Sequence, residues 1–102
     1  MRIGTTPTYV LRISQMENLE DVCLAFKQRG KTLYKHISDN DGRSGMLSNG
    51  AYFTLSERET SMFSDRFGEV ERQVKLKYSD GTVASTDVEY EEVIGAVHEG
   101  EF

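Results

Sequence analysis

The sequence predicts an all-β fold: an antiparallel immunoglobulin-like β-sandwich of about six strands, with one short helix near residues 57–64. Three observations favour it. Apolar and polar residues alternate in several short segments, as in strands with one buried face. Turn-forming residues separate these segments. The 102 residues are 37% hydrophobic and 28% charged, enough for one folded domain. We expect residues 1–94 to form that domain and residues 95–102 to form an acidic C-terminal tail.

The first half of the chain contains three predicted strands and a long loop. Apolar residues recur with a period of two over residues 8–14, which predicts the first strand. Two alternating runs within residues 21–37 flank a glycine turn and predict a hairpin. Residues 38–50 are rich in Asp, Asn, Ser and Gly, so we expect the longest and most mobile loop there. A short strand over residues 51–55 follows.

The only predicted helix follows Ser56. Ser56 and Glu59 have the spacing of a capping box, in which the two residues satisfy free amides at a helix start. We expect this helix over residues 57–64. A single sheet backed by the helix is the alternative architecture, and we rank it second because the helix has too few apolar residues to cover a sheet.

Two further strands are predicted after the helix. Residues 70–78 alternate between apolar and polar types, but Arg72 falls on the inner face, which predicts a sheet edge or an open end at that point. Asp80 and Gly81 are typical of a tight hairpin turn. The last strand is then expected over residues 83–94.

Acidic residues gather near the C-terminus. Residues 1–85 contain 12 basic and 11 acidic side chains, whereas residues 86–102 contain six acids and no Lys or Arg. On a strand, Asp87, Glu89 and Glu91 would share one face, with Glu92 beside them. Such a stripe is typical of a solvated edge that resists strand addition. It would also suit a basic protein partner, whereas direct binding of nucleic acid there is unfavourable because like charges repel.

The only basic cluster lies at the first predicted hairpin turn and consists of Lys27, Arg29 and Lys31, with Lys35 beside them. It is too small to bind phosphates strongly by itself, since that affinity needs several neutralised charges together. We interpret it as the solvated end of a hairpin. Its functional use would be an electrostatic contact with an acidic protein.

Recognised catalytic and cofactor motifs are absent from the sequence. No nucleophile elbow or Cys/His signature surrounds its Ser, His and Asp residues. We expect His36 on a strand surface, His98 in the tail, and Cys23 as a small buried thiol. Residues 39–42 are similar to the start of a calcium loop, but alignment on Gly42 puts an apolar residue at the first ligand position. We therefore expect no cofactor, no metal and no enzymatic activity.

Membrane insertion and secretion are also not expected. No segment approaches the roughly 18 consecutive apolar residues of a membrane span. Residues 1–15 lack the continuous apolar run of a secretory signal peptide.

The opening residues, MRIGTTPT, resemble the start of a group of small proteins encoded by phages and prophages. Further agreement lies at residues 30–31, 55–56, 59–60 and 80–82, so the resemblance spans nearly the whole chain. More loosely, the layout is similar to the small sandwich domains of phage baseplate and tail proteins. That family has no established catalytic residues, and the resemblance implies none here.

The resemblance and the charge pattern lead to one leading hypothesis and one alternative. The leading hypothesis is a noncatalytic, virion- or tail-associated component that binds phage structural proteins in the host cytoplasm or the virion. Residues 4–7 would supply an extended arm, the acidic last strand would supply a contact edge, and self-association into a homo-oligomer is compatible with both. The alternative is an accessory inhibitor, similar to an anti-CRISPR protein, whose carboxylates block the nucleic-acid groove of a host nuclease.

Overall fold

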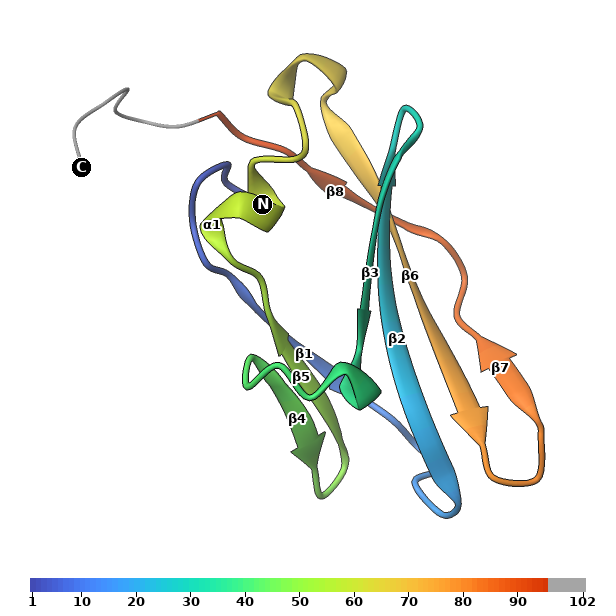
Figure 1. Ribbon diagram of the computed structural model, residues 1–102. Helices are drawn as coiled ribbons and strands as arrows, with labels where there is room; N and C mark the ends of the chain where they lie inside the picture. The colour runs from blue at the N-terminus through green and yellow to red at the C-terminus, as the bar shows by residue number, and fades with distance from the viewer. Residues whose placement is uncertain (96–102) are drawn as a thin grey trace.

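The computed structural model describes residues 1–95 and shows two antiparallel sheets packed face to face, which confirms the predicted all-β sandwich (Figure 1). The smaller sheet has the strand order β1-β5-β4, and the larger sheet has the order β3-β2-β6, with β7 and β8 both paired to the free side of β6. The strands are β1 (Thr8–Arg12), β2 (Leu19–Gln28), β3 (Lys31–His36), β4 (Ser44–Leu47), β5 (Gly50–Thr54), β6 (Glu69–Tyr78), β7 (Val83–Ser85) and β8 (Glu89–Glu92).

The strand pairings show how the two sheets of the sandwich are assembled. Two hairpins, β2–β3 and β6–β7, place β2 and β6 side by side in the middle of the larger sheet, and β5 lies between β1 and β4 in the smaller one. Ahead of β1, the chain runs alongside the end of the last strand, where Arg2 forms a parallel bridge with Ile94. The segment predicted as an extended N-terminal arm therefore follows a residue that is already paired with the rest of the fold.

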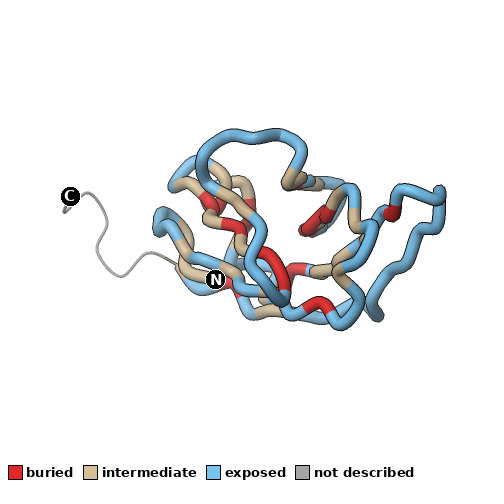
Figure 2. Tube along the Cα trace, turned by 90° about the horizontal axis from the view of Figure 1, so that it is seen from below, coloured by how far each residue is buried: buried red, intermediate tan, exposed pale blue. Residues whose placement is uncertain are grey.

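The core lies between the two sheets, as the distribution of buried positions in Figure 2 shows. Phe26 on β2 is fully buried and meets Tyr9 edge to face, with 5.3 Å between the ring centroids. Burial of each large side chain contributes roughly 1.5–3 kcal/mol, so the alternation read from the sequence is also the main source of stability. The buried apolar cluster comprises Ile13, Val22, Leu24, Phe26, Ala51, Phe53, Leu55, Phe63, Val70 and Val93.

The prediction of one long loop over residues 38–50 is wrong. The short helix η1 (Ile37–Asp39) and strand β4 occupy part of it, and a two-residue turn connects β4 to β5. Gly50 permits this arrangement, because a Cβ atom at that position would lie 1.8 Å from the carbonyl oxygen of Leu11 on β1. The sequence pattern makes Gly50 a loop residue, whereas the structure requires glycine there for the close approach of β5 to β1.

The predicted helix is present but shorter than expected. Helix α1 (Glu57–Thr60) begins at the capping box of Ser56 and Glu59, which the structure confirms. The chain then passes through a turn into the short helix η2 (Asp65–Phe67). The buried side chain of Gln28 accepts from the backbone amide of Ser64 and donates to its carbonyl oxygen, so these groups are unavailable for helical hydrogen bonds.

The last strand follows the predicted course along β6 but is divided into β7 and β8. The pairing shifts by one residue between them, and residues 86–88 form the irregular connection. The strand β6 is therefore paired on both sides, so the expected edge at Arg72 is wrong.

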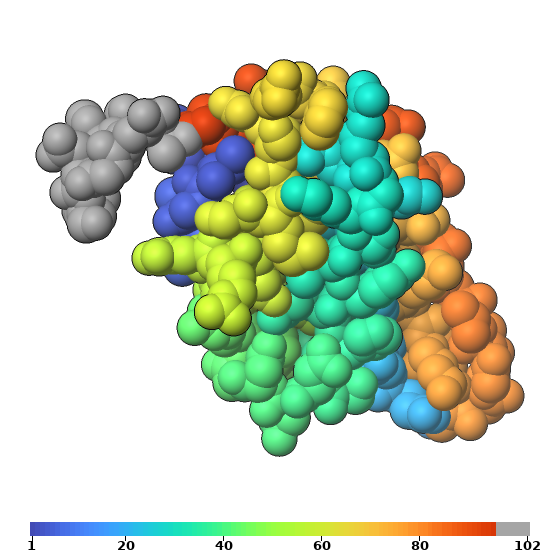
Figure 3. Space-filling view, turned by 45° about the horizontal axis from the view of Figure 1, so that its top comes forward, coloured from blue at the N-terminus to red at the C-terminus, as the bar shows by residue number. Residues whose placement is uncertain are grey.

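One open side of the sandwich is closed by charge pairing at Lys35. Its ammonium group lies 2.9 Å from Asp41 in the loop after η1 and 2.9 Å from Glu59 on α1. Figure 3 shows β4, α1 and the segment that follows α1 lying against β3 on this side. The sequence places Lys35 beside the predicted solvated basic cluster, but the side chain of Lys35 is only 7% exposed. Lys35 faces inward because successive side chains of β3 point to opposite faces of the sheet. The carboxylates of Asp41 and Glu59 compensate for the burial of its charge.

Residues 96–102, including His98 and nearly all of the predicted acidic tail, lie outside the described residues. None of the helices in residues 1–95 has the length and apolar character needed to cross a membrane.

Candidate functional site

The outer face of the larger sheet is uncovered in the described fold. On β2, Val22, Leu24 and Phe26 are buried in the core, so the residues between them lie on the opposite face. Figure 1 shows the smaller sheet and α1 on one side of the larger sheet, and no element of residues 1–95 on the other. Because the buried side supplies the core, the open side is available for another molecule.

Cross-strand register arranges the outer residues in four rows across the sheet. Small residues, Cys23 and Ala25, occupy the middle of β2, while Tyr34 on β3 and Tyr90 on β8 are 62% and 64% exposed. The surface is therefore hollowed in the middle of the sheet, where the side chains are small, and carries aromatic side chains toward the edge strands. In order along the strands, the rows are Asp21, Lys77 and Val83; His36, Cys23, Lys75 and Ser85; Tyr34, Ala25 and Gln73; and Thr32, Lys27, Glu71 and Tyr90.

Three adjoining hollows of about 370, 120 and 380 Å³ follow these rows. The first and second share Tyr34 and Lys75, and the second and third share Lys27 and Glu71. Shared lining residues make the hollows one continuous depression along the sheet. At its far end, the guanidinium of Arg29 stacks over the half-exposed ring of Phe67, 4.4 Å from the ring centroid.

The depression carries more positive than negative charge. The outward-facing cations that line it are Lys27, Arg29, Lys75 and Lys77, and the carboxylates are Asp21, Glu69 and Glu71. Glu92 lies on the same face beside Glu69, so the face is close to neutral, whereas the chain as a whole has a formal net charge of −5. That distribution favours an acidic partner at this surface.

Asp21 and His36 form a fixed pair at one end of the depression. Oδ2 of Asp21 lies 2.9 Å from Nδ1 of His36, and Asp21 also accepts hydrogen bonds from the backbone amide of Val22 and from the amide and hydroxyl of Ser38. Burial opposes the charged form of Asp21, but these hydrogen bonds outweigh it and lower the pKa of this carboxyl. The pair orients the imidazole and leaves its Nε2 on the far side from Asp21.

Cys23 lies directly opposite His36 in the strand pairing, so Asp, His and Cys side chains share this end of the face. Burial raises the pKa of the Cys23 thiol, and the negative charge of Asp21 raises it further. The thiol is therefore kept protonated, which is the opposite of what an activated cysteine nucleophile needs. The prediction of a buried thiol is confirmed, and the thiol lies on the face of β2 opposite Val22, Leu24 and Phe26.

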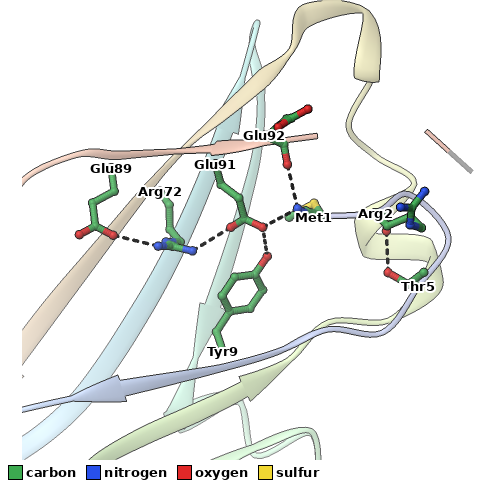
Figure 4. A network of polar contacts seen from close by, with 8 residues as sticks. All are labelled: Met1, Arg2, Thr5, Tyr9, Arg72, Glu89, Glu91 and Glu92. Carbon is green, nitrogen blue, oxygen red and sulfur yellow. Dashed lines mark hydrogen bonds and ion pairs between the residues drawn. The ribbon is translucent and has the colours of Figure 1, made fainter. Parts of the chain in front are cut away.

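The predicted acidic stripe has a different environment from the one expected, as Figure 4 shows. Glu91 points inward and is bonded on both carboxylate oxygens. Its Oε1 accepts from Nη1 of Arg72 at 2.8 Å, and its Oε2 accepts from the hydroxyl of Tyr9 at 2.7 Å. The α-amino group of Met1 lies 2.7 Å from the same Oε2. Glu91 is thus part of the interior polar network of the sandwich.

Arg72 is the centre of this network. Its Nη2 donates to Oε2 of Glu89 at 2.8 Å, and its guanidinium lies 5.4 Å from the ring centroid of Tyr9. Burial raises the pKa of Tyr9, and the hydrogen bond to Glu91 adds to that effect. An arginine on an apolar face is accommodated here because two carboxylates of β8 and one aromatic ring compensate for its charge.

The remaining predicted contact residues are dispersed. Asp87 is exposed in the irregular connection between β7 and β8, and Glu92 is exposed on the strand face opposite Glu91. Lys27, Arg29 and Lys31 are exposed at the end of the β2–β3 hairpin, as predicted, and the first two line the depression. The structure therefore does not bring Asp87, Glu89 and Glu91 together as one free acidic surface.

The predicted N-terminal arm is docked on the fold. The amide of Gly4 donates to the hydroxyl of the buried Thr60 on α1, and that hydroxyl lies 3.0 Å from the carbonyl oxygen of Thr5. The amide of Leu55 donates to the carbonyl oxygen of Pro7. These contacts tie the arm to α1 and to the end of β5.

The loop that is similar to a calcium site is also used within the fold. Asp41 pairs with Lys35, and Asp39 accepts from the backbone amide of His36. Within residues 1–95, no group of three or more His, Cys, Asp or Glu side chains is arranged to hold a metal ion.

Sequence reasoning did not identify the depression on the larger sheet. Its residues come from five strands, and only their register shows that they are neighbours. One signal was present: the polar positions of the segment 21–29 include Cys23 and Ala25, which are smaller than is usual on a solvated face. No family model matches this sequence, and comparison with curated proteins and with solved structures found no significant match.

Proposed function

We propose that this chain is a noncatalytic protein-binding domain that docks an acidic segment of its partner along the outer face of the larger sheet. The observation that carries the proposal is the continuous depression on that face, which is lined by exposed aromatic side chains and lysines. Tyr34, Tyr90 and Val83 each leave more than half of their surface exposed. Exposed aromatic side chains on a rigid sheet are typical anchors of protein interfaces.

Charge complementarity identifies the chemistry of the partner. The cations Lys27, Lys75 and Lys77 lie along the depression at positions that an extended segment could follow. Acidic side chains on that segment would pair with them, and the negative charge elsewhere on the domain would disfavour docking in other places.

The resemblance of the opening residues to phage-encoded proteins supports a place among virion- or tail-associated components, with a phage structural protein as the partner. The alternative inhibitor has less support. It needs the carboxylates of the last strand to face a basic groove, whereas Glu91 is bonded to Arg72 and Tyr9 and Glu89 is bonded to Arg72.

Site-specific crosslinking in cells that produce the phage tests this proposal. A photoreactive amino acid at position 34 or 90 should crosslink one protein that is also present in purified particles, identified by mass spectrometry. The matched control is position 10 on the outer face of the smaller sheet, where Val10 is equally exposed. Crosslinking from position 10 alone, or from neither face, contradicts the proposal.

The purified partner then permits a test of charge. Replacing Lys27 and Lys75 with Glu should weaken its binding by at least about tenfold and reduce the dependence of binding on salt. Arg12→Glu, on the smaller sheet, should leave the affinity unchanged. Equal affinities for the two variants would show that the partner does not use the depression.

A further inference from the structure

The hollow at the end of the depression next to β7 has a composition of its own. Its volume of about 370 Å³ lies in the range of small-molecule sites. A carboxylate on β2, an imidazole on β3 and two ammonium groups on β6 line it. Val83 of β7 adds an apolar wall. Its lining includes Asp21, Cys23, Tyr34, His36, Lys75 and Lys77.

Two ammonium groups face this hollow with little internal compensation. Lys75 lies across from Cys23 in the register, and Lys77 lies across from Asp21. Among residues 1–95, Lys75 forms no ion pair, and the contact of Lys77 with Glu20 is long, at 3.6 Å, between side chains that are both more than half exposed. A pair of this kind contributes little and is readily exchanged for another anion.

The one carboxylate at this hollow is already occupied. Asp21 accepts four hydrogen bonds, from His36, from the amide of Val22 and from two groups of Ser38, so both of its carboxylate oxygens are already bonded within the chain. The same contact holds the imidazole of His36 through Nδ1.

The remaining surfaces of the hollow are apolar or aromatic. The ring of Tyr34 and the side chain of Val83 are 62% and 63% exposed on either side of it. Cys23 forms a small, uncharged floor between them, since burial keeps its thiol protonated. A planar group that lies over Cys23 can therefore contact the ring of Tyr34 and the side chain of Val83.

We propose that this hollow binds an aromatic oxyanion, with the ring against Tyr34 and over Cys23, and with the phosphate or carboxylate held by Lys75 and Lys77. The inference rests on the proposed function in one respect, because the hollow is one end of the proposed docking face. The group that it binds has two sources, an aromatic acid or phosphate on the partner protein or a free small molecule, and the experiment separates them.

Titration of the ¹⁵N-labelled full chain with phenyl phosphate, followed by NMR, tests the inference. Saturable shifts should centre on Cys23, Tyr34, His36 and Lys75. Inorganic phosphate and cyclohexyl phosphate, which lack the aromatic ring, should bind at least about tenfold more weakly. The double variant Lys75→Gln, Lys77→Gln should weaken phenyl phosphate by at least about tenfold. Lys31→Gln, at the hairpin end outside the hollow, is the matched control and should bind as the native chain does.

Absence of saturable shifts at these residues, or equal affinity in the double variant and the native chain, overturns the inference. Its failure is separable from that of the proposed function. A partner that docks on the face while phenyl phosphate does not bind refutes the oxyanion site alone, and the reverse result refutes the docking proposal alone. If phenyl phosphate displaces the partner, the oxyanion belongs to the partner; if both bind together, it belongs to a free ligand.

Discussion

Arg72 and Glu91 meet between the two sheets, where Nη1 of the guanidinium donates to Oε1 of the carboxylate at 2.8 Å. The carboxylate also accepts from Tyr9, so strands β1, β6 and β8 are joined at one charged point inside an otherwise apolar sandwich. The side chain of Glu91 is 19% exposed. The acidic residue that the sequence places in a surface stripe is therefore one of the residues that hold the sheets together.

The first prediction concerns this residue. Glu91→Gln should lower the free energy of unfolding by about 2 kcal/mol, because an uncharged amide leaves the half-buried guanidinium with one carboxylate and turns an N–H group toward other donors. The midpoint of urea denaturation, compared at equal slope, measures this effect. The matched control is Glu92→Gln on the opposite, exposed face of the same strand, which should change stability by less than about 0.5 kcal/mol. Equal midpoints for the two variants would contradict the assigned role.

The strands and their faces could largely be predicted from the sequence, and the partners of charged residues could not. Alternation alone placed Val22, Leu24 and Phe26 inside and identified Arg72 as an inward-facing charge. Its neutralisation by Glu91 depends on the register between β6 and β8, and a one-residue shift at residues 86–88 sets that register. A shift of one residue exchanges the two faces of a strand, so the sequence pattern alone does not decide it.

The same limit applies to the candidate site. Each residue of the depression could be read as a solvated strand position, and most polar positions of this kind are solvated. What distinguishes them is that three strands, β3, β2 and β6, bring Tyr34, Cys23 and Lys75 into neighbouring rows. The sequence does not predict strand β4 for a related reason, because Gly45 and Gly50 are typical of loops. In the structure, Gly45 lies close to Tyr52 and Gly50 lies close to β1, which explains the two glycines.

The second prediction concerns pH and the Lys35 cluster. The hydrogen bond from Lys35 lowers the pKa of Asp41; burial opposes the charge of Glu59, but the Ser56 amide and Lys35 outweigh it and lower that pKa as well. A carboxyl whose pKa is lower in the folded chain stabilises the fold above its unfolded pKa, and that stability is lost as the pH falls through the folded pKa. The ordinary values are 3.8 and 4.5, so the native chain should lose stability as the pH falls below about 4 to 5.

Lys35→Met removes the common partner of these two carboxyls. We expect the variant to be less stable at neutral pH by about 2 kcal/mol and to lose less further stability between about pH 5 and pH 3, because both pKa values move toward their ordinary ones. Urea denaturation across that range measures the difference, and Lys31→Met at the exposed hairpin turn is the control. Curves for the native chain and Lys35→Met that run parallel with pH would show that Lys35 does not hold the two carboxyls.

The third prediction concerns the contact between β1 and β5. Gly50→Ala places a Cβ atom 1.8 Å from the carbonyl oxygen of Leu11, so the two strands must separate. We expect a loss of about 3 kcal/mol or more, seen as a lower midpoint of thermal unfolding by circular dichroism. Ser48→Ala, in the exposed turn two residues earlier, should unfold close to the native temperature. Native-like unfolding of Gly50→Ala would mean that β1 does not pair with β5 as described.

The fourth prediction concerns the reactivity of Cys23. Burial raises its pKa above the ordinary value of 9.0, and the charge of Asp21 adds to the effect, so little thiolate is present near neutral pH. Iodoacetamide should therefore alkylate the folded chain more slowly than it alkylates a free cysteine, and the rate should still be rising at the pH where the rate for a free cysteine levels off. Mass spectrometry of samples quenched over a pH series gives both profiles. Asp21→Asn removes the negative charge beside the sulfur and should shift the profile to lower pH, while Asp80→Asn, at the distant β6–β7 turn, should not. A native profile that levels off below that of free cysteine would show instead that the thiol is activated, and that this end of the sheet is arranged for nucleophilic chemistry.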